Sequence, residues 1–423
     1  MSKSDLINNG RIYLIANIIN ASIPFLLLPL LTRYLTPAEY GEVTMFLALS
    51  VGLTAFVGIS VHGIATNMYY ELGDDKFGQA KFVGSCIQII FLTTLITFSF
   101  ILLFAGFIEE QLGITKYFII GTVLVALANS VIQLRLVQWQ VRKKAKKFGI
   151  FQISFGLCNL LISLFFVVIL DLGSEGRVDA QLISSALFTI VALALLRKDG
   201  LYDIAVFNIG YYKEICSFGI PLIPHIFGLF LLSSFDRVVI KEKLGISEVG
   251  VYMVAMQLSM GLKVVFDALN KAFAPWLYEQ LTLVNNFEMK AKIVRYTYIC
   301  CISLFILPLL TYFLASIAID IVAGDEYARA SSVLVWLVLG QIFAGMYLMV
   351  TNYIFFAKRT LPLSAVSMLS GIIHIGLLYI FIDIYGFVGA GFAFAISMLC
   401  RFILVWWVAI KVYPMPWFNF KAT

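Results

Sequence analysis

The chain has 423 residues, of which 61% are hydrophobic and only 13% are charged, with a formal net charge of +6 and a mean hydropathy of +0.96. A water-soluble domain of this length could not expose such a composition without aggregating, so most of the chain is expected to lie in lipid. A helix that crosses the hydrocarbon core needs about 20 mainly apolar residues, which leaves room for about twelve spans with short connections.

The apolar runs favour helices over a barrel. Runs such as 98–107 and 160–170 lack the in-out alternation of barrel strands, and backbone groups in lipid must be satisfied within a helix or a closed barrel. The sequence therefore predicts an all-α polytopic membrane protein. Its predicted spans are, in chain order, 12–32, 41–61, 82–107, 117–137, 148–170, 180–196, 218–240, 249–269, 293–319, 332–357, 361–382 and 386–410.

Prolines mark two of these spans. The first span contains Pro24 and Pro29, and no small-residue cleavage site follows a short apolar core, so we expect a retained span with a bend rather than a signal peptide. Pro221 and Pro224 lie near the start of the seventh span, where proline is tolerated, so no bend is predicted there.

Positive charge predicts the orientation. Most of the 30 Lys and Arg residues fall in the connections on the side of the N-terminus, and the largest group is the run 142–147. Such an asymmetry in short loops places both termini in the cytoplasm. The run could also be a patch for anionic lipid or nucleic acid, but an orientation signal is the preferred interpretation, and no nucleic-acid partner is expected.

An internal repeat divides the chain. A shift of 209 residues aligns 35–41 with 244–250, keeping Leu, Glu and Gly in register, and pairs Leu49, Ser50, Gly52 and Leu53 with Leu258, Ser259, Gly261 and Leu262. The matched regions are six spans apart, so they run in the same direction through the membrane. We therefore predict two six-helix lobes related by a parallel repeat, residues 1–205 and residues 206–423, an arrangement typical of transporters.

Ionisable residues within spans are the first candidates for a substrate site, because they are costly in lipid and normally face the protein interior or a wet cavity. Arg401 lies inside the last span and His374 near the middle of the eleventh, while Asp236 and Arg237 lie near the outer end of the seventh. On the eighth span Lys263 and Asp267 are four residues apart, hence on one helix face, and Asn270 follows. For an anionic lipid substrate, these cations would hold the head group.

Each candidate also has a structural interpretation. Lys263 with Asp267, and Asp236 with Arg237, can be local pairs whose long side chains reach the interface. Asn17 and Asn20 share a face of the first span, where hydrogen bonding between helices is at least as good an explanation as ligand binding.

Enzyme and metal chemistry find little support. The sequence has no Gly-x-x-x-x-Gly-Lys-Ser/Thr loop for ATP, and Asp74 and Asp75 lack a third carboxylate for Mg²⁺. The six cysteines lie in or beside apolar runs, and the three histidines have no ligand-like spacing. We expect no catalytic residues, no metal and no cofactor.

Four patches carry a resemblance to a known family: 35–41 (LTPAEYG), 217–225 (SFGIPLIPH), 235–240 (FDRVVI) and 250–252 (GVY). With the length and span count, they resemble the polysaccharide-transport branch of the multidrug/oligosaccharidyl-lipid/polysaccharide (MOP) exporters, and within it the O-antigen flippases of the Wzx type. The resemblance implies a bacterial inner-membrane protein that flips undecaprenyl-pyrophosphate-linked O-antigen units from the cytoplasmic to the periplasmic leaflet by alternating access. It also implies a positively charged cavity between the lobes, lined chiefly by spans 1, 2, 7 and 8, which favours Lys263, Asp236 and Arg237 over Arg401.

The implied partners are the lipid-linked oligosaccharide and membrane lipids, with an O-antigen polymerase and a chain-length regulator as further candidates. The alternative function is an ion-coupled exporter of small drugs from the same superfamily. Such an exporter should place unpaired carboxylates at mid-membrane, whereas Asp236, Asp267 and Asp320 lie near predicted helix ends.

Overall fold

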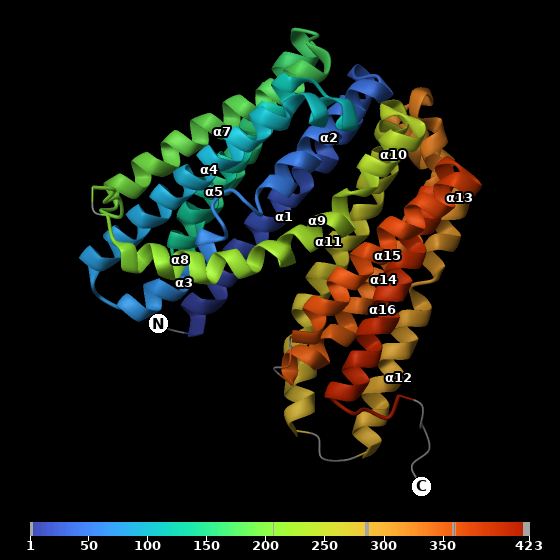
Figure 1. Cartoon of the computed structure of the whole chain (residues 1–423). Helices are drawn as coiled ribbons and strands as arrows, with labels where there is room; N and C mark the ends of the chain where they lie inside the picture. Colours follow the sequence, from blue (N-terminus) through green and yellow to red (C-terminus); the bar gives the residue numbers. More distant parts are fainter. Residues whose placement is uncertain (1–2, 206, 284–286, 358, 360, 418–423) are drawn as a thin grey trace. The chain divides into compact units, whose positions relative to one another are not determined.

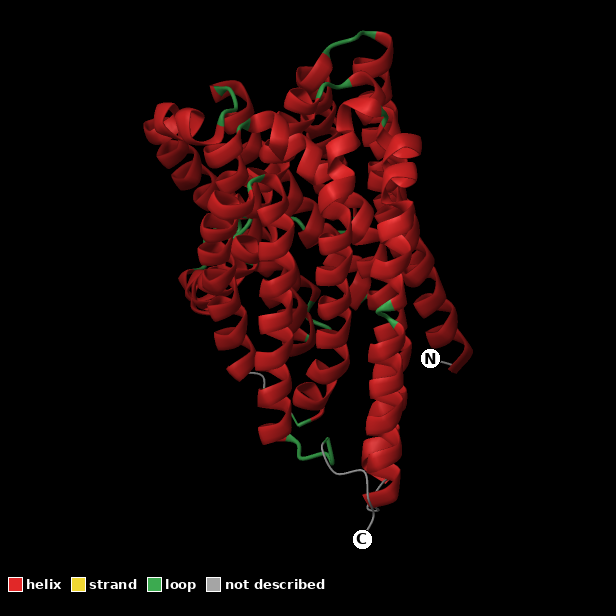
Figure 2. Cartoon of the chain, turned by 90° about the vertical axis from the view of Figure 1, so that its right-hand side faces the viewer, coloured by secondary structure: helices red, strands yellow, loops and turns green. Residues whose placement is uncertain are grey.

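The computed structural model describes residues 3–205, 207–283, 287–357, 359 and 361–417. Within this part of the chain the regular elements are all helical, and no strand occurs (Figure 2). By their internal contacts the residues form two compact units, Met1–Phe230 (unit 1) and Leu231–Thr423 (unit 2). The all-α membrane fold is confirmed.

Unit 1 contains ten helical segments, coloured from blue to green in Figure 1. They are α1 (Lys3–Tyr34), α2 (Pro37–Leu53), α3 (Val61–Leu72), α4 (Lys76–Leu112), α5 (Lys116–Val141), α6 (Ala145–Leu164) with its π-helical extension η1 (Phe165–Ile169), α7 (Gly173–Lys198), α8 (Ile209–Gly219) and the 3₁₀ turn η2 (Ile220–Leu222), followed by most of α9 (Ile223–Ser234).

Unit 2 takes the chain from the end of α9 to the C-terminus. Its elements are α10 (Asp236–Leu244), α11 (Ile246–Leu283), α12 (Phe287–Ser303), α13 (Ile306–Ala323), the 3₁₀ segment η3 (Asp325–Ala330), α14 (Ser331–Phe356), α15 (Leu361–Tyr385) and α16 (Phe387–Val412).

Eleven helices or helix pairs of the described residues are long and apolar enough to cross a membrane. They correspond to the predicted spans with one exception, the second. There the prediction of one helix over 41–61 is wrong, because α2 ends at Leu53 and α3 begins only at Val61. Counting this interrupted span, the chain has the expected total of about twelve.

The repeated segment begins a helix in both units. In unit 1, Thr36 caps α2 in a capping box, since the Thr36 backbone N–H donates to Glu39 Oε2 at 2.9 Å and the Glu39 backbone N–H donates to Thr36 Oγ1. In unit 2 the equivalent Glu248 lies in the first turn of α11 and pairs with Arg329 of η3. Helix α11 begins 209 residues after α2, so the sequence offset is also a structural one.

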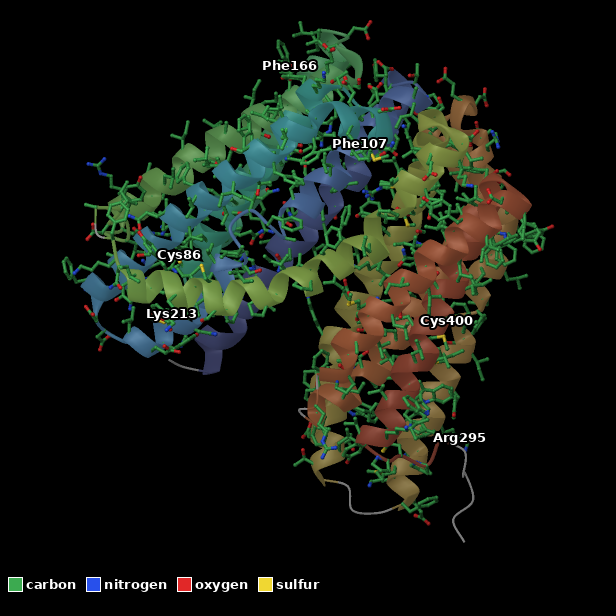
Figure 3. The ribbon with its side chains drawn as sticks, viewed as in Figure 1. Cys86, Phe107, Phe166, Lys213, Arg295 and Cys400 are labelled. Carbon is green, nitrogen blue, oxygen red and sulfur yellow. The ribbon has the colours of Figure 1, made fainter. Side chains whose placement is uncertain are left out.

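A buried core organises unit 1 around α5, which packs against α2, α3, α4 and α7. Cys86 lies in this core on α4 and is fully buried (Figure 3). At one end of α5, Arg135 is 1% exposed and forms an ion pair with Asp199, which follows α7. Its guanidinium carbon also lies 4.0 Å from the ring centroid of Trp139. Burial alone would raise the pKa of Asp199, but Arg135, helped by Lys144 and Lys147, lowers that pKa below its ordinary value.

Helix α8 packs on α3 and α4. Phe82 and Tyr211 make an edge-to-face contact with ring centroids 5.2 Å apart, and the Tyr212 hydroxyl donates to Gln88 Oε1 at 2.6 Å. The division by contacts therefore falls after Phe230, later than the repeat boundary predicted at residue 205. The two boundaries describe different things, because one follows packing and the other follows the sequence offset.

In unit 2, α14 packs against α11, α13 and α16, and α15 packs against α10 and α16. Polar contacts connect these helices, one partly buried and one exposed. The Asn352 side-chain nitrogen donates to Asn270 Oδ1 at 2.7 Å, which joins α14 to α11. Lys243 on α10 pairs with Asp383 on α15 at 2.9 Å. Such contacts fix the helix register where apolar packing alone is unselective.

Candidate functional site

The two ionisable candidates on α11 share one helix face, as their spacing predicts. The Lys263 ammonium lies 3.8 Å from Asp267 Oδ2, and their side chains are 62% and 44% exposed. Asn270, three residues further on, faces α14 through its hydrogen bond with Asn352. An exposed, loosely paired ammonium can exchange its carboxylate for another anion at little cost. Lys263 is therefore available to bind a phosphate oxygen.

Asp236 and Arg237 begin α10 and are buried inside unit 2, with 2% and 8% of each residue exposed. The Asp236 carboxylate accepts the backbone N–H of Arg237 at 2.9 Å, and Arg237 Nε donates to the Met253 sulfur at 3.0 Å. Asp236 lies at a helix end and faces the protein interior, as expected of an ionisable residue in a span. A buried carboxylate is a group that can bind a proton or a cation.

His374 lies fully buried on α15, where its Nδ1 is 2.9 Å from Ser397 Oγ of α16. The Ser397 hydroxyl donates to the carbonyl of Ala393, so its oxygen must accept from His374 Nδ1, which fixes the Nδ1–H tautomer of the neutral ring. Nε2 is buried without a hydrogen-bond partner. This geometry makes His374 a link between α15 and α16, and its contact with substrate stays a prediction.

Arg401 on α16 lies against α14. Its guanidinium carbon is 4.1 Å from the ring centroid of Tyr347, and its Nε is buried without a hydrogen-bond partner among the described residues. A stacked guanidinium of this kind stabilises the contact between two helices. Arg401 therefore joins α16 to α14, and its contact with substrate also stays a prediction.

The asparagines of α1 differ from each other. Asn17 is exposed, whereas Asn20 is partly buried and faces α6, where its Oδ1 lies 3.1 Å from the position of a Cβ on Gly156. Helices α1 and α6 pack together along this face. Asn20 therefore belongs to a helix contact, and Asn17 is the member of the pair that a ligand could reach.

The sequence interpretation missed an interruption inside unit 1, between α2 and α3. Gly58, Ile59 and Ser60 have positive φ angles of 77°, 36° and 57°, and residues 57–60 are buried. Side chains from neighbouring helices satisfy the non-helical backbone. Thr93 accepts the Gly58 N–H at 2.9 Å, and Ser130 donates to the Val57 carbonyl at 3.1 Å. Irregular backbone at membrane depth is tolerated only where it is covered in this way.

A second interruption meets the first. The seventh span leaves α-helical geometry at η2, beside Pro221, although no irregularity was predicted there. The Cα of Gly219 lies so close to the interruption in span 2 that an added Cβ would be 2.1 Å from the Ile59 carbonyl oxygen. In contrast, α1 continues as one helix past Pro24 and Pro29, and the predicted bend there stays a prediction. Broken helices that meet inside the protein are typical of transporters.

We expect Gly219→Ala to destabilise unit 1 by about 1–3 kcal/mol, the usual cost of overpacking, because its methyl group would overlap a backbone carbonyl. The matched control is Gly228→Ala on α9, where no atom lies within 4 Å of the added Cβ. Thermal unfolding of the purified protein in detergent compares the two. Equal midpoints for both variants would show that the two interruptions are not in contact.

The residues that could hold a ligand are therefore the cation of Lys263, the carboxylate of Asp236 and the polar atoms of α11. No group of three or more metal-binding side chains gathers among the residues that the structure describes.

The family model for polysaccharide biosynthesis proteins matches residues 6–280, about two thirds of the chain. The chain belongs to the polysaccharide biosynthesis protein family. The resemblance to the polysaccharide-transport branch is confirmed, and the narrower likeness to O-antigen flippases stays a prediction.

Two relatives of this protein are similar to it over most of both sequences. An uncharacterized membrane protein of Haemophilus influenzae is 25% identical, covering 90% of this chain and 91% of its own. A capsular polysaccharide biosynthesis protein, CapF, of Staphylococcus aureus is 20% identical, covering 81% and 84%.

Solved structures extend the comparison to the fold. A lipid II flippase, MurJ, in an inward closed conformation has a TM-score of 0.73 at 14% identity, covering 94% of this chain and 87% of its own. An inward-facing multidrug resistance MATE transporter of the MOP superfamily has a TM-score of 0.70 at 15% identity, covering 93% and 94%. At these identities the likeness concerns the fold alone.

Proposed function

We propose that this protein carries an undecaprenyl-pyrophosphate-linked O-antigen unit from the cytoplasmic to the periplasmic leaflet of a bacterial inner membrane, without changing it covalently. The observation that supports this best is the family match over residues 6–280 in a chain of membrane-spanning helices. Interrupted helices and a parallel repeat are features of alternating-access transporters. The available cation of Lys263 supplies the charge that a pyrophosphate needs when it leaves water.

Deleting the gene in its native host is expected to abolish long-chain surface O-antigen and to leave the lipid A core intact, because the repeat unit would stay on the cytoplasmic face. Gel electrophoresis of lipopolysaccharide measures both species. A plasmid copy of the gene restores the long chains and serves as the control. Normal long-chain lipopolysaccharide in a clean deletion, in a host with no second flippase gene, would reject the proposed function.

The orientation that we propose is tested separately. The connection at Arg142–Lys144 and the start of α7 at Gly173 lie at opposite ends of α6 and η1, and α6 alone is about 30 Å long. Because the basic run favours the cytoplasm, reporters fused after Lys147 and at the C-terminus should indicate cytoplasm, and one fused near Gly173 should indicate periplasm. Alkaline phosphatase and β-galactosidase fusions provide the measurement. Reversal of any two locations would contradict the orientation.

One observation favours the alternative, an ion-coupled drug exporter. Asp236 is buried inside unit 2, and a buried carboxylate can bind a coupling ion. Its position near a helix end had counted against this function. Drug susceptibility separates the two functions. We expect the deletion strain to keep its resistance to cationic dyes and antibiotics, while a marked loss of resistance with normal O-antigen would favour the exporter.

A further inference from the structure

A cavity of about 400 Å³, open on one side where Leu269 and Trp276 are exposed, lies in unit 2 between α11, α14 and the junction of α12 with α13. Its volume is in the range of small-molecule sites. Its lining residues are Phe266, Leu269, Asn270, Phe273, Trp276, Cys300, Leu304, Gly345, Leu348 and Met349. The cavity belongs to neither of the interruptions in unit 1, and none of the sequence candidates for head-group binding lines it.

The lining of the cavity is almost entirely apolar. Asn270 brings the only amide side chain, and the rest of the wall is apolar or aromatic. Phe266, Phe273 and Trp276 recur along one face of α11, and the rings of Phe273 and Trp276 lie 5.6 Å apart at 36°. Gly345 lets the Phe266 ring lie directly on α14, since an added Cβ would be 2.7 Å from that ring. Aromatic and aliphatic side chains with so few polar atoms suit a hydrocarbon chain rather than a polar ligand.

The charged face of α11 borders this wall. Lys263 comes three residues before Phe266, roughly 5 Å along the helix axis, and Asp267 and Asn270 continue the polar face. On α11, the cation of Lys263 is thus followed by the residues that line the apolar cavity. Their spacing fits a ligand whose phosphate is joined directly to a single hydrocarbon chain. In a glycerophospholipid, by contrast, a glycerol and two ester groups separate the phosphate from two chains.

We propose that this cavity holds the isoprene units nearest the pyrophosphate of a polyprenyl-linked substrate while Lys263 binds the pyrophosphate itself. The proposal rests on the proposed function, which it deepens by assigning the lipid part of the substrate to α11, α12, α13 and α14. The polar face positions the head group, and the apolar wall holds the hydrocarbon chain.

Cys300 gives a direct test, because it lines the cavity and is exposed, whereas the next residue, Cys301, is buried. The wild-type protein in nanodiscs is treated with a small maleimide, and mass spectrometry measures the labelling of each cysteine. At tenfold the dissociation constant, undecaprenyl pyrophosphate should slow labelling of Cys300 about tenfold, by simple occupancy. Labelling of Cys400 on α16, which lies outside the cavity lining, serves as the internal control.

Two variants sharpen the result. Leu348→Trp fills the cavity from α14 and should remove protection by the lipid, whereas Ile302→Trp adds the same bulk at a 70% exposed position of α12 that does not line the cavity and should keep it. Size-exclusion elution shows that each variant is folded. If Leu348→Trp does not fold, Lys263→Ala takes its place and should raise the concentration needed for protection.

The outcomes separate the two proposals. Equal protection of Cys300 by phosphatidylglycerol would overturn the polyprenyl assignment and show a site for any lipid chain. No protection by undecaprenyl pyrophosphate, in a protein whose deletion abolishes surface O-antigen, would overturn the cavity and leave the proposed function standing. Protection that Ile302→Trp abolishes and Leu348→Trp preserves would place the chain elsewhere and also overturn the proposal.

Discussion

Asp199→Asn is expected to destabilise unit 1 by about 3–5 kcal/mol, the usual cost of removing one partner from a buried ion pair. The substitution removes the negative charge beside the Arg135 guanidinium, which is 1% exposed, lies over Trp139 and has Nε and Nη1 without partners among the described residues. Unfolding by guanidinium chloride in detergent micelles measures the free energy of unfolding. Arg135→Met should cost less, because the 21% exposed Asp199 can turn to water.

The double variant Arg135→Met with Asp199→Asn is the control for this prediction. It strands no charge, so it should be more stable than Asp199→Asn alone. A double variant as unstable as the single one would show that the loss comes from packing rather than from the unpaired arginine.

The same ion pair sets a dependence on pH. Because folding lowers the pKa of Asp199, its stabilising contribution is present above the ordinary carboxyl pKa of about 3.9 and is lost as the pH falls through the lower, folded value. The wild type should therefore lose more stability than the double variant as the pH falls from 5 to 2. Parallel pH profiles for the two proteins would contradict this assignment.

Lys263→Ala is expected to reduce O-antigen export at least about tenfold, because a pyrophosphate leaving water loses a charged partner worth more than 1.4 kcal/mol. Lys263→Arg should keep most of the activity, since arginine also binds phosphate. The stability of the protein should hardly change, because the pair with Asp267 is exposed and 3.8 Å long. The measurement is the amount of long-chain lipopolysaccharide at equal protein level in the membrane.

The neighbouring carboxylate provides the comparison for this prediction. Asp267→Asn should affect export less than loss of the cation does. If Lys263 and Asp267 are only a local pair, Lys263→Ala combined with Asp267→Asn should export as well as the wild type, since no stranded charge remains. Full export by Lys263→Ala alone would remove this residue from the site.

Much of the fold could be predicted, because the cost of leaving apolar residues out of lipid depends on composition along the chain and little on tertiary contacts. Eleven of the twelve predicted spans were found on that basis. The interruption at residues 54–60 could not be found in this way, since its sequence is as apolar as a helix. Its stability depends on Thr93 and Ser130, on two other helices, which bind the Gly58 N–H and the Val57 carbonyl. Gly58 was the available signal.

The candidate site could be predicted less well. Helical spacing was enough to place Lys263 and Asp267 on one face of α11. Depth along a span was not enough for His374 and Arg401, because it does not tell which neighbour a side chain meets. Ser397 and Tyr347 are the neighbours that these two residues contact in the structure. The cavity of unit 2 needs side chains from α11, α12 and α14, far apart in sequence, and apolar patterning is the same with or without it.

The position of α8 determines how this protein can be divided. By sequence α8 opens the second repeat, yet it packs on α3 and α4 with Ile215 fully buried in their core. If the chain were divided at residue 205, the first polypeptide would expose Phe82, whose ring contacts Tyr211 of α8, and the second would expose Ile215. A break at residue 205 would therefore produce complementary fragments rather than two autonomous modules, and coexpression of both in one cell tests whether they assemble.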